Sequence, residues 1–79
     1  MQEMNLGDLP LNQTGVVKHF LRHNTLTDRI ISLGITEGAE ITAAFRSPFG
    51  DPTAYFVKGC LIALRKSDCE HITVLPKGE

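Results

Sequence analysis

Long apolar runs are absent from this sequence, and their absence excludes one broad class of protein. The longest unbroken apolar run, Cys60 to Leu64, is far shorter than the roughly 20 residues that a helix needs to cross a bilayer. The amino terminus also lacks a basic start followed by an apolar stretch, so no signal peptide is predicted. We therefore expect a cytoplasmic chain with no direct membrane insertion.

An excess of charge of either sign is also absent. Lys and Arg number 8, Asp and Glu number 9, and the formal net charge is −1, so the composition implies neither an acidic nor a basic partner. The local basic residues are Lys18, His19, Arg22, His23 and Arg29. A surface that binds nucleic acid would interleave aromatic rings with these charges, but only Phe20 lies among them, on the strand face opposite His19. Nucleic-acid binding is therefore a minor alternative, and we expect no nucleic-acid partner.

Motifs of catalysis are lacking as well. The chain has no glycine with the spacing of a phosphate-binding loop, G-x-x-x-x-G-K-[ST], so any nucleotide hydrolysis would occur on a partner. A nucleophilic cysteine needs a basic neighbour and a third group that orients this base. His71 follows Cys69 closely and would share a strand face with it, but this pair alone does not make a catalytic site. We expect no enzyme activity.

Cysteine is scarce, with 2 residues in all. In a reducing compartment, Cys60 and Cys69 are expected to be free thiols rather than a disulfide. Together with His71, and with the distant His19 and His23, they could supply metal ligands. Tight structural sites, however, show paired short spacings such as Cys-x-x-Cys, which Cys60 and Cys69 do not have. We therefore predict no metal site and no cofactor, and keep Cys60, Cys69 and His71 as secondary metal candidates.

What the chain does contain is a series of short β-strand patterns in a single domain, residues 1–79, whose last residues, 76–79, we expect to be a loose tail. Alternating and β-branched residues predict strands at 16–21, 40–45, 53–57, 60–65 and 71–75, with 66–68 as a tight connection. This pattern suggests a small closed or nearly closed barrel, mostly β with one short α-helix. The predicted core consists of Ile30, Leu33, Ile41, Phe45, Ile62, Leu64, Ile72 and Val74.

One helix is predicted after Thr25, which would act as its N-cap, with Asp28 completing a short capping box. Its apolar face, at the spacing i, i+4 and i+7, consists of Leu26, Ile30 and Leu33. Gly34 ends the helix. A glycine in the left-handed conformation would let Ile35 fold back onto Ile30, which is the apolar contact that accompanies this kind of ending.

The segment Ser47-Pro48-Phe49-Gly50 predicts a type I turn, because Ser, Pro and Gly occupy the positions they favour, and Asp51-Pro52 leads into the next strand. The turn does not require Phe49. The favoured interpretation is that Phe49 folds over an open end of the barrel, because exposed large apolar residues are uncommon. The alternative is a contact presented to a partner, with Arg46 and Asp51 as its polar rim. Further candidates for binding an acidic partner are Arg29 and Arg65.

Several spaced segments, RIISLGI, GAEI, SPFGDP and VKGCLIALRKSDCEHITV, together resemble the FeoA family of small cytoplasmic proteins of bacterial ferrous iron uptake. The likeness covers nearly the whole chain. It implies a small five-stranded SH3-like β-barrel and a role beside FeoB, the membrane ferrous iron transporter with a cytoplasmic GTP-binding domain. It does not imply catalysis. Family members commonly have a small residue such as Ala where Cys69 stands, which fits a buried, inert side chain.

These observations together predict a non-catalytic accessory or regulatory protein of ferrous iron uptake. It would act by protein–protein interaction with the cytoplasmic side of a FeoB-type transporter. The alternative is a free-standing SH3-like adaptor or regulatory domain with another protein partner, and a metal- or nucleic-acid-binding module is less favoured. Weak self-association is left open.

Overall fold

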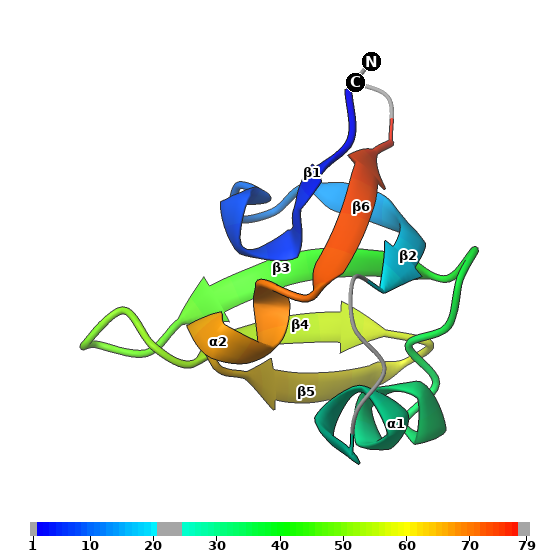
Figure 1. The fold of residues 1–79 in the computed structure, drawn as a ribbon. Helices are drawn as coiled ribbons and strands as arrows, with labels where there is room; N and C mark the ends of the chain where they lie inside the picture. The colour runs from blue at the N-terminus through cyan, green and yellow to red at the C-terminus, as the bar shows by residue number, and fades with distance from the viewer. Residues whose placement is uncertain (1, 21–24, 78–79) are drawn as a thin grey trace.

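A single antiparallel sheet of six strands dominates the computed structural model, which describes residues 2–20 and 25–77. The strand order across the sheet is β1-β6-β2-β3-β4-β5. In chain order the elements are β1 (Met4–Asn5), the 3₁₀ helix η1 (Leu6–Asp8), β2 (Thr14–Phe20), α1 (Thr25–Ser32), β3 (Glu40–Arg46), β4 (Thr53–Val57), β5 (Cys60–Leu64), α2 (Lys66–Cys69) and β6 (Ile72–Pro76) (Figure 1). The fold is mostly β, as predicted, with β1, η1 and α2 in addition to the predicted elements.

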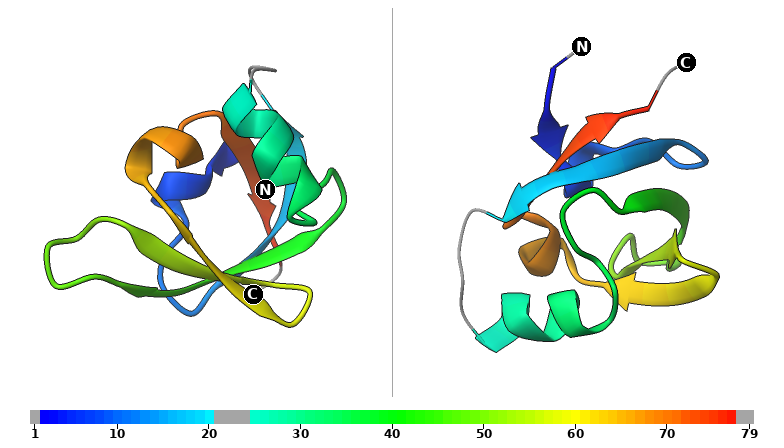
Figure 2. Two further views of the ribbon diagram at one scale, coloured as in Figure 1. Left: turned by 90° about the horizontal axis from the view of Figure 1, so that it is seen from below. Right: turned by 90° about the vertical axis from the view of Figure 1, so that its right-hand side faces the viewer.

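The sheet curves around the core but does not close into a barrel (Figure 2). β1 and β5 are its two edges, and within residues 2–20 and 25–77 no ladder joins them. Residues 66–68, predicted as a tight connection, belong to α2, which packs against η1. The expectation of a closed or nearly closed barrel is therefore corrected to an open, curved sheet, because helical segments follow β5 and β1 where a closing ladder would be needed.

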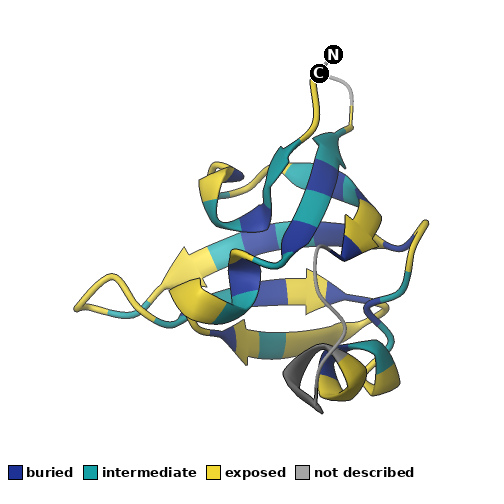
Figure 3. Ribbon diagram, in the orientation of Figure 1, coloured by how far each residue is buried: buried dark blue, intermediate teal, exposed yellow. Residues whose placement is uncertain are grey.

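The core lies inside the curved sheet, where alternate residues of the strands are buried (Figure 3). Its members are Leu6, Leu9, Val17, Phe20, Ile30, Ile35, Ala39, Ile41, Ala43, Tyr55, Val57, Leu64, Cys69, Ile72 and Val74. Most of the predicted core is confirmed, and Ile62 packs against it while remaining half-buried. The amino-terminal leucines Leu6 and Leu9 and the cysteine Cys69 are core residues that the sequence patterns did not predict.

Phe45 was predicted to be a core residue, and this prediction is wrong, since its exposed fraction is 56%. The cause is a β-bulge between β3 and β4. Ala43 pairs with Tyr55, but Phe45 pairs with Ala54, so β3 has one residue more than β4 across this interval. An extra residue reverses the alternation of faces beyond it. Phe45 therefore lies on the outer face of the sheet.

The end of α1 confirms the prediction made for Gly34, whose φ is +101°. The Gly34 N–H donates to the Ile31 carbonyl at 2.9 Å, and the Ile35 N–H donates to the Ile30 carbonyl at 3.3 Å, which is the Schellman pattern. Ile30 and Ile35 are both buried. Leu33, predicted to be buried, is 47% exposed, because Ile30 and Ile31 are the residues of α1 that face the core.

The start of α1 leaves one prediction without a test. The helix begins at Thr25, but the side chains of Thr25 and Leu26 lie outside the part of the chain that the structure describes. The capping box with Asp28 therefore stays a prediction.

Residues 76–79 were predicted to be a loose tail, but Pro76 and Lys77 are held by the sheet. Pro76 is the last residue of β6 and pairs with Gly15. The Lys77 N–H donates to the Thr14 carbonyl at 2.8 Å, and the Lys77 ammonium pairs with Glu40 at 2.6 Å. Residues 78–79 lie outside the described part of the chain. β6 reaches so far because it lies between β1 and β2 and pairs with both.

Replacing Gly34 by valine should lower the free energy of unfolding by about 1–2 kcal/mol, because a β-branched residue is strained at positive φ. A Cβ at this position would lie 3.6 Å from Lys58 Cδ, so the loss comes from the backbone and not from a clash. Urea unfolding measures it as a lower midpoint with an unchanged slope. Gly34→Asn is the control, since Asn tolerates this conformation better. A valine variant with the wild-type midpoint would contradict the assigned helix ending.

Candidate functional site

The β3–β4 hairpin projects from the body of the molecule (Figure 1) and has an internally bonded tip. The Gly50 N–H donates to the Ser47 carbonyl at 2.8 Å, which is the predicted turn bond. The Ser47 N–H donates to the Pro52 carbonyl at 3.0 Å, and the Ser47 hydroxyl donates to the Asp51 carbonyl at 2.8 Å. Phe49 is 96% exposed. The interpretation of Phe49 as a lid is therefore wrong, because the hairpin carries its tip beyond the core.

Asp51 connects this hairpin tip to α2. Its Oδ1 accepts a hydrogen bond from the Lys66 N–H at 2.7 Å, at the first residue of the helix. Its Oδ2 lies 3.9 Å from Nη1 of Arg65. A carboxylate that accepts from a free N–H at the start of a helix satisfies a donor that otherwise has no partner in the helix. Asp51 thus positions the hairpin relative to α2, a role that the sequence analysis did not predict.

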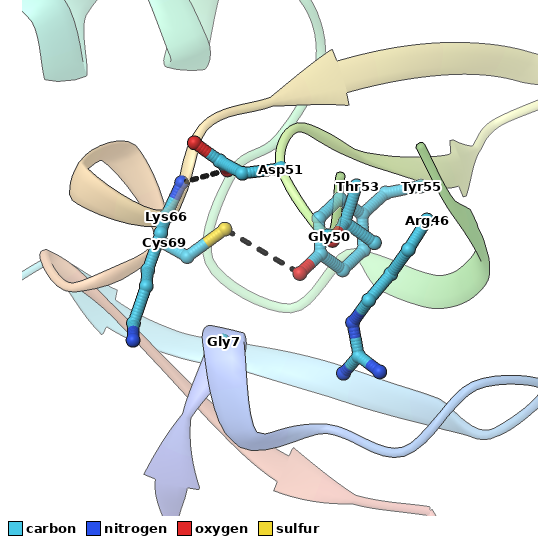
Figure 4. A pocket seen from close by; sticks show the side chains of 8 residues that line it. All are labelled: Gly7, Arg46, Gly50, Asp51, Thr53, Tyr55, Lys66 and Cys69. Atoms are coloured by element: carbon cyan, nitrogen blue, oxygen red, sulfur yellow. Dashed lines mark hydrogen bonds between the residues drawn. The ribbon is translucent and has the colours of Figure 1, made fainter. Parts of the chain in front are cut away.

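A pocket of about 240 Å³ lies between the hairpin, η1 and α2 (Figure 4). Its lining residues are Gly7, Arg46, Gly50, Asp51, Thr53, Tyr55, Lys66 and Cys69. Tyr55 and Cys69 are buried, whereas Arg46, Asp51 and Lys66 are exposed. The pocket therefore joins an uncharged inner part to a charged rim, and two of the predicted partner residues, Arg46 and Asp51, belong to this rim.

The two buried residues of the pocket, Tyr55 and Cys69, are uncharged at neutral pH. The Cys69 thiol donates to the Tyr55 hydroxyl at 3.4 Å. The pKa of Cys69 is raised to about 11, chiefly by burial; the Tyr55 hydrogen bond opposes this rise, and the carboxylates of Asp68 and Asp51 add to it. Burial also raises the pKa of Tyr55, with the Cys69 hydrogen bond as the next cause. Since the thiolate is the nucleophilic form, Cys69 is protonated and unreactive at neutral pH.

The secondary metal candidates do not come together. Cys60 is an exposed free thiol at the start of β5, and Cys69 is a buried free thiol at the end of α2. His71 was expected to share a strand face with Cys69, and this is wrong because Cys69 is helical. His19 lies 3.2 Å from Glu3, and His23 is outside the described residues. Among the described residues, no group of three or more His, Cys, Asp or Glu could hold a metal ion.

The melting temperature of the purified protein should be the same with and without a strong chelator, because the core of the sheet supplies its stability. A metal held only by the folded state at a hundred times its Kd would contribute about 2.7 kcal/mol. In a domain of this size, that corresponds to a shift of about 10 °C or more. Thermal unfolding followed by circular dichroism in EDTA is the measurement. A fall of that size would contradict the prediction that this chain has no metal site.

The predicted partner residues fall on two surfaces. Arg46, Asp51 and Arg65 lie around the hairpin and α2, with Phe49 at the tip. Arg29 lies on α1, at a second groove of about 300 Å³. The lining of that groove is Arg29, Ile30, Leu33, Leu61, Ile62, Ala63, Leu64 and Asp68.

Sequence analysis missed Lys66 at the first pocket and Leu61 at the second groove. No local signal marks Lys66, since its approach to Asp51 depends on how β5 returns along β4. The exposure of Leu61 could have been predicted, because successive side chains of a strand face opposite sides and Ile62 was assigned to the core.

The model of the FeoA domain matches residues 4–76. The chain belongs to the FeoA family. This family is related to ferrous iron transport, and FeoA proteins are small accessory proteins rather than known enzymes. No curated protein sequence matches the chain.

Solved FeoA structures share the fold. The FeoA protein of Chlorobium tepidum is 27% identical with a TM-score of 0.88, over 95% of this chain and 71% of that one. The FeoA-like protein of Clostridium acetobutylicum is 26% identical with a TM-score of 0.90, over 100% and 92%. Stenotrophomonas maltophilia FeoA, complexed with zinc and described as a prokaryotic SH3 domain protein, is 31% identical with a TM-score of 0.79, over 90% and 88%. The fold of this FeoA-family chain is therefore SH3-like.

In the part that the structure describes, no helix has both the length and the apolar character that a membrane crossing requires.

Proposed function

We propose that this chain is a non-catalytic accessory protein of bacterial ferrous iron uptake, and that it acts in the cytoplasm by binding a FeoB-type membrane transporter. Membership of the FeoA family supports the link to ferrous iron transport. The zinc-bound relative from Stenotrophomonas maltophilia, described as a candidate activating factor for ferrous iron transport, supports a regulatory role. The chemistry of Cys69 supports the non-catalytic part, since this buried thiol is held in its protonated form.

Phe49 is the observation that carries the interaction hypothesis. Its ring is 96% exposed, at a tip whose backbone is held by the hydrogen bonds of Ser47 and Gly50. A ring on a pre-ordered turn loses little conformational freedom on binding, where immobilising a flexible side chain costs about 0.5–1.5 kcal/mol. Aromatic residues are also enriched among the few residues that dominate interfaces. The exposed charges of Arg46, Asp51 and Arg65 would form a polar rim around this contact.

Retention by membranes tests the proposal. A tagged copy of the chain is incubated with membrane vesicles that contain the cognate FeoB-type transporter, and with vesicles from the same cells without it. We expect the chain to sediment with the first vesicles only, and to remain bound at physiological salt. Equal sedimentation with both kinds of vesicle, or with neither, would contradict the proposed function.

A further inference from the structure

The second groove runs along the free edge of β5. Residues 61–64, consecutive residues of one strand, all line it. Because successive side chains of a strand point to opposite faces, a groove that touches each residue in turn lies along the strand's edge. β5 pairs with β4 alone, and it is the last strand of the sheet. The other wall consists of Arg29 and Ile30 of α1 and of Leu33, which directly follows α1, and α1 lies beside β5 in Figure 1.

The register of the β4–β5 hairpin shows which backbone groups of β5 have no partner. The φ values of Lys58 and Gly59, +50° and +85°, are those of a two-residue type I′ turn, which closes on the pair Val57 and Cys60. In an antiparallel ladder, alternate pairs exchange hydrogen bonds. The Leu61 and Ala63 pairs are therefore the non-bonded ones, and their N–H and C=O groups point to the free edge. An edge of this kind is a template for another strand.

Apolar surface accompanies this edge on both walls. Leu33, directly after α1, is 47% exposed, and Leu61 on β5 is 58% exposed. Arg29 lies at the same groove, and no carboxylate among the described residues forms an ion pair with it. Asp68, by contrast, already accepts a hydrogen bond from the Arg65 N–H at 3.0 Å. The groove thus offers backbone donors and acceptors, two leucines and one unpaired cation.

We propose that this groove binds an extended segment of a partner protein. The segment would pair with β5 as one further strand, antiparallel or parallel, and lie between β5 and α1. The proposal rests on the proposed function, in which the partner is the transporter. Main-chain hydrogen bonds to Leu61 and Ala63 would hold the segment, and apolar residues at its alternate positions would contact Leu33 and Leu61. An acidic residue of the segment would pair with Arg29, because this charge has no partner within the described chain.

Other occupants fit the groove less well. A second copy would bring its own β5 with β4 paired to the other edge, and α1 stands on the side where that second strand would have to lie. Neighbouring strands are about 4.8 Å apart, so the β4 of a second copy would have to lie where α1 forms the other wall of the groove. A segment of a different protein with an acidic residue fits the groove better, because the charge of Arg29 has no partner among the described residues.

Hydrogen exchange with peptide probes tests the groove. The isotope-labelled protein is mixed with overlapping synthetic peptides that cover the cytoplasmic segments of the cognate transporter. We expect a peptide with alternating apolar residues and an acidic residue to slow the exchange of the Leu61 and Ala63 amides at least tenfold. The Ile62 amide, already bonded to β4, should change little. If no peptide binds, or if binding leaves Leu61 and Ala63 unprotected, the proposal is overturned.

Matched variants separate the groove from the rest of the surface. Leu33→Glu should weaken binding of that peptide at least tenfold, whereas Phe45→Glu, which changes an exposed apolar residue of β3, should not. Arg29→Glu should also weaken it, unlike Lys18→Glu, which makes the same charge change on β2. If Leu33→Glu does not fold, the comparison of Arg29→Glu with Lys18→Glu still tests the proposal.

Groove variants that bind normally overturn this inference alone, provided that transporter vesicles retain the wild type. A wild type that the vesicles do not retain overturns the proposed function first.

Discussion

Replacing Leu6 by alanine should lower the free energy of unfolding by about 2–5 kcal/mol, the usual range for removing a buried leucine side chain. Leu6 has an exposed fraction of 0% and belongs to the single core cluster. It lies in η1, which packs against α2 at the open side of the curved sheet. A cavity there cannot be closed by sliding two paired strands together, so we expect little relief by relaxation. Domains of this size are only marginally stable, which makes such a loss a large share of the total.

Thermal and urea unfolding measure this effect, and the melting temperature should fall by about 10 °C or more. Leu61→Ala is the matched control, because the same atoms are removed from a side chain that is 58% exposed. Its free energy of unfolding should change by about 0.5 kcal/mol or less. If Leu6→Ala unfolds at the wild-type midpoint, the amino-terminal segment does not contribute to the core as the structure describes.

Replacing Phe49 by serine should reduce retention by transporter-containing vesicles at least tenfold while leaving the melting temperature unchanged. The ring is 96% exposed, so its removal costs almost no burial within the folded chain. Pro48, Gly50 and Pro52 stay in place, and the bonds of Ser47 to the turn do not involve the ring. A tenfold loss corresponds to about 1.4 kcal/mol, which is modest for an aromatic residue at the centre of an interface.

Phe45→Ser is the control for this prediction. Phe45 is 56% exposed on the outer face of β3, close in sequence to the hairpin tip but outside the turn. We expect this variant to be retained like the wild type. If Phe49→Ser is retained fully, the hairpin tip is not part of the contact with the transporter. If its melting temperature falls steeply while retention persists, the ring contributes to the fold and not to the partner.

The two surfaces lead to different expectations for the same partner. The hairpin tip offers one ring on a pre-ordered turn, and it should act through side-chain contacts. The groove beside β5 offers main-chain groups, and it should act through protection of amides. Because Phe49 lies in the β3–β4 turn and Leu33 at the groove beside β5, the effects of Phe49→Ser and Leu33→Glu on binding should be close to additive.

Local sequence by itself determined how α1 ends and how the β3–β4 turn closes. Gly34 is at positive φ with Ile35 folded onto Ile30, and the Ser47–Gly50 turn closes as predicted, because these features depend on neighbours within a few residues. The period-two patterns also located all five predicted strands, with shifts of one or two residues at their ends. The spaced segments were sufficient to indicate the FeoA family, because their order along the chain is itself a property of the sequence.

Only the tertiary structure decided what these elements do together. The bulge in β3 that exposes Phe45 depends on the register with β4, and Asp51 meets Lys66 only because β5 returns alongside β4. β1 exists as a strand because Met4 pairs with Val74 at the other end of the sequence. Phe49 is exposed because the hairpin extends past the core. Each of these depends on contacts between residues far apart in the chain, for which periodicity and turn chemistry hold no signal.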